Sequence, residues 1–587
     1  MSTAVPTGAA RAAEDPLHGV DPALAADQAA VEPLLRAWVR ETGIALPPSG
    51  ARARLPLPGQ GIALLVPVLH RSAGGWHRFG RVRRERSGGE AGPELPHREV
   101  ATLLLREAAL QQGRPASAAD PAIARARDSA GRIAEHLDDR WAHPEDPTGE
   151  RSFRAGEQAL TVGHPFHPAG KGREEDDPVR LRELSPELRG RVRLRWLGVR
   201  PVDLVGEGPG EEPIAETLRR MASDDGVAVP ADRVPLPLHP SQAARLLAGG
   251  PVADALATGR LVDLGSATAS WSPTSSLRTL EREGARWMAK LSLGLRITNS
   301  RRENRRPELR LGRHVGALAT ALEALEGHRP SVGVLLDAAW ASADVAGPGE
   351  EHGLALALRD AVVGAGDPTI CLAGLVAERP RQGPSRLGAI VRERAAAGGG
   401  STEEAARAWL DALLDVLVLP LLRWHDVHGV GVEAHAQNAL VTLDPDGLPV
   451  RGWYRDGQGW YVARAHAAAW QRRLPCLEPA GCQLVFDDAL VADRVAYYLG
   501  VNALLGVVGA LGADGVADER ALLDRVRDRL EPVARARPDG VAARLRDAPT
   551  LTSKCNLLTT VDGRDELDGP VATQSVYREI PNPIAHA

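Results

Sequence analysis

Lysine is the residue that this chain most lacks. Of the 71 lysines and arginines in its 587 residues, only Lys171, Lys290 and Lys554 are lysines. The Ala-, Arg- and Gly-heavy composition suggests a coding bias that erodes lysine, so the survivors are candidates for positions that arginine cannot fill. Arginine is a wide planar fork, whereas lysine is a compact point charge on a flexible stem. We therefore interpret each lysine as a candidate contact for a charged ligand.

Other scarcities exclude whole classes of protein. The four cysteines form no CxxC pair and no zinc-ligand spacing, so we expect reduced structural thiols rather than a disulfide framework. The first 21 residues lack the apolar stretch of a signal peptide, and no apolar run reaches the length of a membrane span. A net charge of −5 does not indicate the basic surface that binds nucleic acid. These absences predict a cytoplasmic protein with neither membrane nor nucleic-acid partners.

What is present indicates a globular α+β protein. Hydrophobic residues make up 43% and charged residues 25% of the chain, and the length predicts about two to four domains. Ser401 and Glu404 form a capping box that predicts a helix start, and "DPDG" predicts a hairpin turn. We divide the chain into residues 1–27 (disordered tail), 28–148 (helical, with a strand near Gly61–His70), 149–385 (mixed strands and helices) and 386–587 (largely helical with β-hairpins).

The first candidate site is the stretch "GHPFHPAGKGR", residues 163–173. It is not a phosphate-binding P-loop, because Pro165 stands where the first glycine belongs and no Ser or Thr follows Lys171. His164 and His167 could form a metal pair, but Pro165 and a second proline forbid the regular helix that would present them together. A proline-braced loop with hydrogen-bonded histidines is the plain alternative. Two histidines with a lysine and an arginine suit a carboxylate or phosphate ligand better than a metal.

The second candidate site follows Pro273. Ser276, Arg278 and Thr279 form a polar turn, and the apolar run "RWMAKLSLGLRIT" then carries Lys290 on a predicted strand. A buried lysine is costly unless an anion pairs with it. The turn, this lysine and the arginine of "ITNSRR" could together clamp the phosphates of a nucleotide, as the strand lysine of kinases does. A surface strand with solvated charges is the alternative.

The third candidate site is "EAHAQN", residues 433–438, with "RDGQG" a hairpin later. Glu433, His435 and Gln437 alternate, so on a strand they would share one face. An asparagine and an aspartate separated by a hairpin, here Asn438 and Asp456, are how kinase-like folds hold Mg²⁺ on phosphates. A polar hairpin face is the alternative.

These stretches, in this order, resemble the NRPS-independent siderophore synthetases of the aerobactin-synthetase (IucA/IucC) type. The matching pieces also include "PLHPSQ", and together they span residues 163–459, with Lys554 extending the match. The resemblance implies a three-part, hand-like architecture with thumb, fingers and a kinase-like palm. It also implies a homodimeric enzyme that uses ATP and Mg²⁺ to adenylate a carboxylate such as citrate, then joins it to an amine or hydroxyl with release of AMP and pyrophosphate.

The resemblance also carries residue roles onto matching positions. It implies ATP contacts from Ser276, Arg278, Thr279, Lys290, His435, Gln437, Asn438 and Asp456, with Glu433, Asn438 and Asp456 on the Mg²⁺ side. It implies contacts to the carboxylate substrate from His164, His167, Lys171, Thr298, Arg302, Arg494 and Lys554. The residues expected to carry the chemistry are Lys290, Arg302 and His435.

One departure from the family pattern concerns the pocket mouth. Where the family usually continues with a Gly-Phe pair, this chain has "EEDDP" after Arg173. The acidic run could attract a cationic amine, or it could be a solvated loop. Three other functions stay open: a kinase-like phosphotransferase, which would release ADP, a degenerate member that only binds a siderophore, and a ligase that makes a carboxylate amide outside siderophore synthesis.

Overall fold

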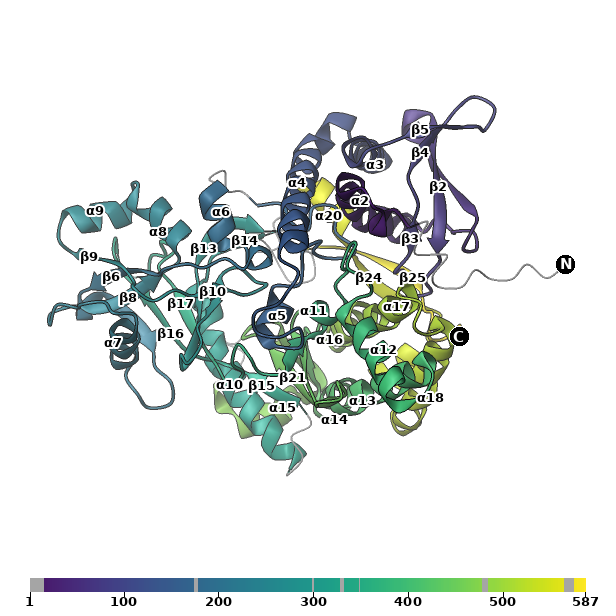
Figure 1. Ribbon diagram of the computed structural model, residues 1–587. Helices are drawn as coiled ribbons and strands as arrows, with labels where there is room; N and C mark the ends of the chain where they lie inside the picture. Colours follow the sequence, from purple (N-terminus) through teal and green to yellow (C-terminus); the bar gives the residue numbers. More distant parts are fainter. Residues whose placement is uncertain are drawn as a thin grey trace.

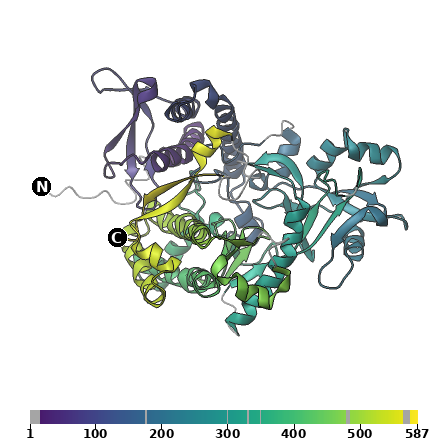
Figure 2. The same cartoon turned by 180° about the vertical axis from the view of Figure 1, so that it is seen from behind.

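The computed structural model shows three adjoining regions of mixed helix and sheet (Figure 1). The structure describes residues 15–173, 178–297, 300–327, 332–347, 349–477, 484–563 and 575–586. The purple to dark blue N-terminal region, the teal middle region and the green to yellow C-terminal region lie side by side in both views (Figures 1 and 2). Each region has its own cluster of buried hydrophobic side chains, which confirms the expected α+β class.

The N-terminal region is a small antiparallel sheet packed on helices, and so contains more strand than the sequence predicts. The sheet has the order β1-β2-β4-β5, with β3 also paired to β2. Along β1 exposed and buried side chains alternate, so one face of the sheet meets the helices. The elements are η1 (Pro16–His18), α2 (Pro22–Thr42), β1 (Arg52–Leu57), η2 (Pro58–Gln60), β2 (Ile62–His70), β3 (Arg78–Phe79), β4 (Arg83–Glu85), β5 (Ala91–Glu94), α3 (His97–Gln111), η3 (Ala116–Ala119) and α4 (Asp120–Ala142).

Helix α2 begins inside the segment that the sequence predicts as a tail. The Asp21 side chain accepts hydrogen bonds from the backbone N–H groups of Ala23 and Leu24, and proline occupies the first helical position. Leu17 is only 1% exposed. The prediction of a tail through residue 27 is therefore wrong for residues 15–27, because proline and aspartate here start a helix rather than disrupt one.

The middle region holds two larger antiparallel sheets and the two-stranded sheet β13-β14. One has the order β10-β11-β12-β17-β16-β7 and the other β8-β6-β9. The run around Lys290, predicted as one strand, forms two, β12 and β13, which are separated at Ser292. The elements are α5 (Phe153–Glu157), α6 (Pro178–Leu184), η4 (Pro186–Leu188), β6 (Arg195–Val199), η5 (Pro201–Asp203), β7 (Leu204–Glu207), α7 (Ile214–Asp224), β8 (Val234–Leu238), α8 (Pro240–Leu247), α9 (Pro251–Ala257), β9 (Leu261–Ser266), β10 (Ser272–Pro273), β11 (Thr279–Glu281), β12 (Trp287–Leu291), β13 (Leu293–Ile297), β14 (Ser300–Arg302), α10 (Arg306–Glu326), β16 (Asp337–Ala343) and β17 (Leu356–Asp360).

The C-terminal region combines a four-stranded sheet, β15-β21-β20-β18, with a large helical core. The predicted hairpin joins β20 to β21. The elements are β15 (Val332–Leu335), β18 (Thr369–Cys371), α11 (Leu372–Val376), α12 (Arg386–Gly398), α13 (Thr402–Leu413), η6 (Leu414–Val418), α14 (Leu419–His428), β19 (Val430–Val432), β20 (Ala439–Leu443), β21 (Pro449–Arg455), β22 (Trp460–Ala463), α15 (Arg464–Arg473), η7 (Pro475–Leu477), β23 (Val485–Phe486), α16 (Asp488–Val495), η8 (Ala496–Leu504), α17 (Leu505–Ala513), α18 (Glu519–Ala536), α19 (Val541–Asp547), β24 (Thr550–Cys555), α20 (Asn556–Asp562) and β25 (Val576–Pro581).

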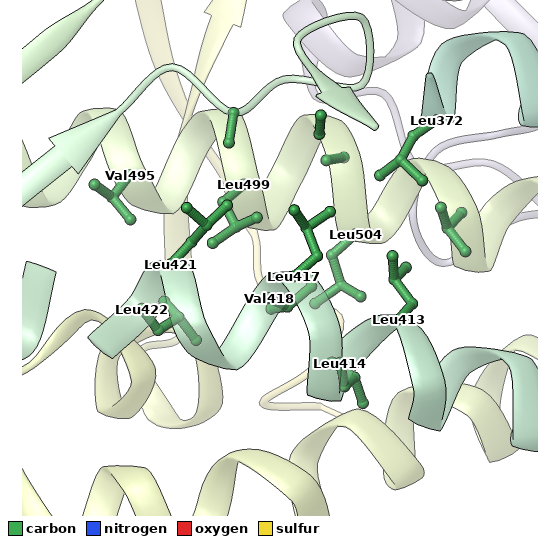
Figure 3. Close-up of a cluster of buried hydrophobic side chains, with 14 of the residues drawn as sticks. Leu372, Leu413, Leu414, Leu417, Val418, Leu421, Leu422, Val495, Leu499 and Leu504 are labelled. Carbon is green, nitrogen blue, oxygen red and sulfur yellow. The ribbon is translucent and has the colours of Figure 1, made fainter. Parts of the chain in front are cut away.

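Two long helical stretches form the centre of this core. The run α13-η6-α14 opens at Ser401 with the predicted capping box, both hydrogen bonds of which are present. Its leucines, among them Leu417 and Leu421, face Leu499 and Leu504 of the run α16-η8-α17 (Figure 3). Each run passes through a π-helical turn, η6 or η8, without leaving the helical path. The strands of this region therefore pack against a layer of leucines that recur at helical spacing.

The regions do not follow the predicted boundary at residues 385 and 386. Strand β15 pairs in parallel with β21, and β18 pairs with β20, although β15 and β18 both precede that boundary. Helix α20, near the chain end, buries Leu557 and Val561 in the cluster of the N-terminal region. The chain thus crosses between regions several times, and the cavity described below lies where they meet.

Candidate active site

A cavity of about 430 Å³ is lined by all three regions. Most of the predicted site residues converge on it from segments far apart in the sequence. Of those residues, Thr298 lies outside the part of the chain that the structure describes, and Arg494 does not line the cavity. The remainder do line it: His164, His167, Lys171, Ser276, Arg278, Thr279, Lys290, Arg302, Glu433, His435, Gln437, Asn438, Asp456 and Lys554.

Lys290 lies at the centre of a buried cluster of four charges. Its Nζ donates to Asp337 Oδ2 at 2.9 Å and to Asp456 Oδ1 at 2.7 Å. Arg359 completes the cluster, with Nε 2.7 Å from Asp337 Oδ1 and Nη2 3.0 Å from Asp456 Oδ1. Although burial alone would raise it, the pKa of Asp456 is held below its ordinary value by the charges of Lys290 and Arg359. The predicted anionic partner of the buried lysine is therefore supplied by the protein itself.

Asp337 and Arg359 are functional candidates that the sequence analysis missed. Asp337 opens β16, and Arg359 lies directly opposite it on β17. Each stands in an apolar run, "VGVLLDAAW" and "GLALALRDAV". A charged residue in a buried strand needs a partner, so these interruptions were a usable signal. The sequence spacing gives no hint that the two pair with one another or with Lys290.

The backbone at Asp456 is held in an unusual conformation. Its φ of 145° is outside the range that a residue with a side chain ordinarily adopts. The indole N–H of Trp460 donates to the Asp456 carbonyl at 2.9 Å. A Cβ at the following Gly457 would lie 2.5 Å from Asp337 Oδ2, so only glycine fits there. The "RDGQG" motif thus places the Asp456 carboxylate close to the Asp337 carboxylate, and Lys290 bonds to both.

The polar turn after β10 borders the same cluster. Leu277 has a φ of 63°, and Ser276 Oγ accepts from the backbone N–H of Thr279 at 3.2 Å. Thr279 is the direct register partner of Lys290 across β11 and β12. Arg278 is buried and donates to Asn304 Oδ1 at 2.9 Å, and burial lowers its pKa only to about 10. It therefore stays charged at neutral pH and faces the cavity as a fixed cation.

The segment from Glu433 to Asn438 is a loop that ends in a turn, so the strand on which its alternate side chains would share one face does not form here. The backbone N–H groups of Asn438 and Ala439 both bond to the carbonyl of His435, which folds the chain back on itself before β20 begins. Gln437 reaches across to the middle region, with Nε2 3.0 Å from Ser275 Oγ. Turn formation, rather than strand alternation, brings these side chains to the cavity.

Burial keeps two of the cavity histidines, His164 and His435, in the neutral form at neutral pH. Burial lowers the pKa of His435 to about 4 and that of His164 to about 3, with help from neighbouring cations. Nδ1 of His164 accepts from Phe166 N at 3.1 Å, and Nδ1 of His167 accepts from Ala169 N at 3.0 Å. In the neutral ring the other nitrogen then carries the proton. Nε2 of His164 faces the side-chain amide nitrogen of Asn502 at 3.4 Å, so His167 is the better candidate to donate to an anionic ligand. The described residues contain no cluster of metal-ligating side chains.

Lys171 has its charge balanced inside the protein. Its Nζ bonds to Glu187, whose other oxygen accepts from Arg173 Nη2 at 2.9 Å. The two cations hold the pKa of Glu187 well below its ordinary value, although its burial opposes this. Lys171 therefore fixes the loop that carries His164 and His167, and its assignment as a substrate contact rests on its place in the cavity lining alone. The acidic run at residues 174–177 lies outside the described residues.

Three further predicted residues stand at the C-terminal side. Lys554 lies on β24, opposite Tyr577 of β25. Arg494 on α16 bonds to the hydroxyl of Tyr577 and lies over its ring, 4.6 Å from the centroid. Glu433 accepts a hydrogen bond from the Tyr461 hydroxyl, and burial raises its pKa. Burial makes Glu433 release its proton less readily than Asp456, so Glu433 is the weakest of the predicted metal contacts.

Family models match two parts of this chain. Residues 152–377 match the IucA / IucC family, and residues 407–569 match a model described as ferric iron reductase FhuF-like transporter. One helical stretch of the described residues, Asp488–Ala513, is long and apolar enough to span a membrane, but 89% of its apolar window is buried inside the protein.

Curated relatives and solved structures resemble almost the whole chain. The rhizobactin siderophore biosynthesis protein RhbC of Rhizobium meliloti is 34% identical over 554 residues, which are 91% of this chain and 92% of the relative. A spermidine-citrate ligase of Bacillus anthracis is 28% identical over 90% of this chain and 89% of the relative. The ATP-bound aerobactin synthetase IucA from a hypervirulent Klebsiella pneumoniae superimposes with a TM-score of 0.84 and 28% identity, covering 95% of this chain and 99% of that one.

Proposed function

We propose, from the premise that the chain belongs to the IucA/IucC family, that it is an ATP-dependent ligase of siderophore synthesis. In the first step a carboxylate oxygen of citrate or a related polycarboxylate attacks the α-phosphorus of ATP, and pyrophosphate leaves. In the second step an amine or hydroxyl attacks the acyl carbon, AMP leaves, and an amide or ester forms. The observation that carries the proposal is the convergence of Lys290, Arg278 and Arg302 on one cavity.

The electrostatics of the cavity suit this first step. ATP and a polycarboxylate are both anions, so fixed cations must hold them together and neutralise the charge that grows at the α-phosphate. Lys290 and Arg359 are preorganised by Asp337. When phosphates arrive, Lys290 can turn toward them as a point charge, whereas Arg278 offers a planar fork. We assign Ser276, Thr279, His435, Gln437 and Asn438 to the same nucleotide.

A magnesium ion fits beside this nucleotide. Mg²⁺ is usually held by one or two carboxylates together with substrate phosphates, rather than by a protein cage. Asp456 and Asn438 both line the cavity, and the pKa of Asp456 keeps it ionised. We assign these two residues as the Mg²⁺ contacts. The ion would supply charge neutralisation on the phosphates.

The carboxylate substrate is assigned to the other side of the cavity. We assign three hydrogen-bond donors to this substrate, either cationic or neutral: Arg302, His167 and Lys554. Thr298 is assigned with them because of its position in the family motif. Two relatives are named for citrate: the spermidine-citrate ligase, and an N(2)-citryl-N(6)-acetyl-N(6)-hydroxylysine synthase of Escherichia coli that is 31% identical over 65% of this chain and 67% of the relative. Citrate or a citrate half-amide is therefore the acid we expect.

Three coarser features complete the proposal. We assign the N-terminal, middle and C-terminal regions as thumb, fingers and palm of a hand-like enzyme, because together they enclose the cavity. We expect a homodimer in the cytoplasm, as the family resemblance implies.

A kinase-like phosphotransferase remains the second candidate, because Lys290 and Asp456 lie together as a kinase's phosphate-binding pair would.

The products separate the two candidates. The purified chain is incubated with ATP and Mg²⁺ and with citrate, succinate or a hydroxamate half-ester, each with hydroxylamine as a trap. Pyrophosphate, AMP and a hydroxamate from one acid would support the ligase and name its acid. Release of ADP with a phosphorylated product would instead support the phosphotransferase.

A further inference from the structure

Helix α5 of the middle region packs tightly against β18 and α11 of the C-terminal region. All five of its residues, Phe153–Glu157, are buried. A Cβ at Gly156 would collide with the Ile370 side chain, and a Cβ at Gly374 of α11 would lie 2.5 Å from the Gly156 carbonyl oxygen. Only glycine therefore fits at both positions, and this close approach fixes where Glu157 stands at the end of the helix.

The Glu157 carboxylate holds groups from two regions. Its side chain is only 1% exposed. Oε2 accepts hydrogen bonds from the backbone N–H and the hydroxyl of Ser275, at 3.0 and 2.8 Å. Oε1 lies 2.7 Å from Nη1 of Arg455, which ends β21 directly before Asp456. One carboxylate thus joins the polar turn after β10 to the "RDGQG" motif.

The other contacts of Ser275 and Arg455 close a ring. Nη2 and Nε of Arg455 donate to the backbone carbonyl of Gln437, at 2.7 and 3.1 Å. Nε2 of Gln437 donates to the Ser275 hydroxyl at 3.0 Å. Glu157, Ser275, Gln437 and Arg455 therefore form a closed ring of contacts, here called the Glu157 ring. It links the polar turn after β10 to the loop at residues 433–438 across the boundary between two regions.

The Glu157 ring borders the cavity, but Glu157 itself does not. Ser275, Gln437 and Arg455 line the cavity, whereas Glu157 stands behind them. The three side-chain nitrogens of Arg455 all face acceptors of the protein, so this arginine is committed to the ring rather than to a phosphate. A buried ion pair is not needed for stability as such, because apolar residues of similar volume stabilise a core as well or better. The geometry that the pair fixes explains it better.

We propose that Glu157 is a positioning residue for ATP, which sets the spacing between the polar turn after β10 and the loop at residues 433–438. Both segments carry residues that we assign to the nucleotide, and a ligand that spans them makes all of its contacts at one spacing only. The donors that we assign to the acid lie outside the ring. This inference rests on the proposed function for the identity of the ligand, and it adds a residue that does not line the cavity.

The test measures the two ligands separately. The Kd of ATP with Mg²⁺ is measured by titration calorimetry, and the KM of the active acid is measured from pyrophosphate release at saturating ATP. Glu157→Gln keeps the shape of the side chain but sets an amide against the Arg455 guanidinium, which opens the ring. We expect the Kd for ATP to rise about tenfold, the effect of losing roughly one charge-assisted hydrogen bond to the phosphates. The KM for the acid should not change.

A second variant answers the case in which Glu157→Gln fails to fold because the Arg455 charge is left buried without its partner. Glu157→Gln combined with Arg455→Met removes both charges, and replacing both members of a buried pair costs much less stability than breaking the pair. The glutamine can still accept from Ser275. We expect this double variant to unfold near the wild-type melting temperature, yet to bind ATP at least about tenfold more weakly.

Glu281→Gln is the matched control. Nε of Arg154, on the same helix α5, lies 2.5 Å from Glu281 Oε1, and both side chains are buried. Neither residue lines the cavity. This variant also breaks a buried ion pair of α5, so it should lower the melting temperature and leave the Kd for ATP unchanged.

Three results would overturn the role of Glu157. They are a wild-type Kd for ATP in the folded variants, a Kd for ATP and a KM for the acid that rise together, and an equal rise in Kd in the Glu281→Gln control. The proposed function fails in a different way. A wild-type protein that binds ATP but releases no pyrophosphate with any acid would refute the ligase, while the Kd values would still decide the role of Glu157.

Discussion

The three lysines of the chain come from three distant segments, and all of them line the same cavity. They differ in what balances them. Lys171 is neutralised by Glu187, and Lys290 is shared between Asp337 and Asp456. Lysine scarcity therefore singled out three residues that converge on one cavity, and their roles at a site stay a prediction. It could not separate a lysine that braces a loop from one that meets a ligand, since that difference lies in partners distant in sequence.

The central role of Lys290 gives the first residue-scale prediction. Lys290→Ala should lower the rate of pyrophosphate release by roughly 10²–10³-fold, the usual cost of removing one preorganised charge donor. Arg302→Ala should instead raise the KM for the acid about tenfold or more and leave the KM for ATP nearly unchanged. Initial rates over ranges of ATP and acid measure both effects. Near-wild-type turnover in both variants would refute the site assignment.

Asp337 gives a second prediction, because it orients both cations and touches no assigned substrate. Asp337→Asn should lower pyrophosphate release at least about tenfold, since the preorganisation of Lys290 and Arg359 is lost. Asp360→Asn is the matched control: Asp360 ends the strand on which Arg359 lies, but among the described residues its side chain makes no hydrogen bond to Lys290, Asp337, Arg359 or Asp456. Equal loss in the two variants would show a general effect on folding rather than a loss of orientation.

At the scale of elements, the sequence predicted those features that a few neighbouring residues determine. The capping box at Ser401 set the start of α13, and the "DPDG" turn set the hairpin β20-β21. For residues 433–438 the sequence left a strand or a loop open, because alternation of polar residues does not distinguish a strand from a turn that backbone hydrogen bonds close. The sequence did not predict the short strands β3 to β5, because their pairing partners, and not their own residues, define them.

Helix α20 gives a pH prediction at this scale. Glu41 of α2 accepts from the backbone N–H groups of Leu557 and Leu558, each at 2.8 Å, and burial raises its pKa to about 7. Since the folded pKa lies above the ordinary 4.5, the native state binds the extra proton between these values, and stability falls as pH rises through about 7. The expected loss is at most about 3 kcal/mol.

The measurement compares thermal unfolding of the wild type and Glu41→Gln at pH 5 and pH 8. Glutamine cannot ionise, and the loss of one acceptor for Leu557 or Leu558 lowers the variant's stability by an amount that does not change with pH. We expect the wild type to lose melting temperature relative to the variant on going from the lower to the higher pH. A difference in melting temperature that does not change with pH would mean that Glu41 does not titrate in this range.

At the scale of the whole molecule, the sequence predicted the regions better than the boundaries between them. Composition marked residues 378–386 as a break, yet β15 and β18 pair across it with β21 and β20. Such pairing is set by long-range backbone hydrogen bonds, which leave no local trace in composition. The Arg36–Glu378–Arg78 cluster and helix α20 tie the N-terminal region in as well.

This interleaving predicts how fragments behave. Residues 386–587 expressed alone lack β15 and β18, so the sheet of the C-terminal region would expose β20 and β21 as unpaired edges. We expect this fragment to be insoluble or to melt without a cooperative transition, and co-expression with residues 1–385 to restore both solubility and activity. A soluble fragment with a sharp unfolding transition would show that the boundary at residue 385 separates independent domains.

The transfer of oxygen from the carboxylate to the nucleotide tests the central claim most directly. The active acid is labelled in its carboxylates with the heavy isotope of oxygen, and the products of one turnover with ATP and Mg²⁺ are analysed by mass spectrometry. Attack at the α-phosphorus followed by acyl transfer predicts that AMP carries the label and pyrophosphate does not. Label in inorganic phosphate, with ADP as the nucleotide product, would contradict adenylation and place the attack at the γ-phosphorus.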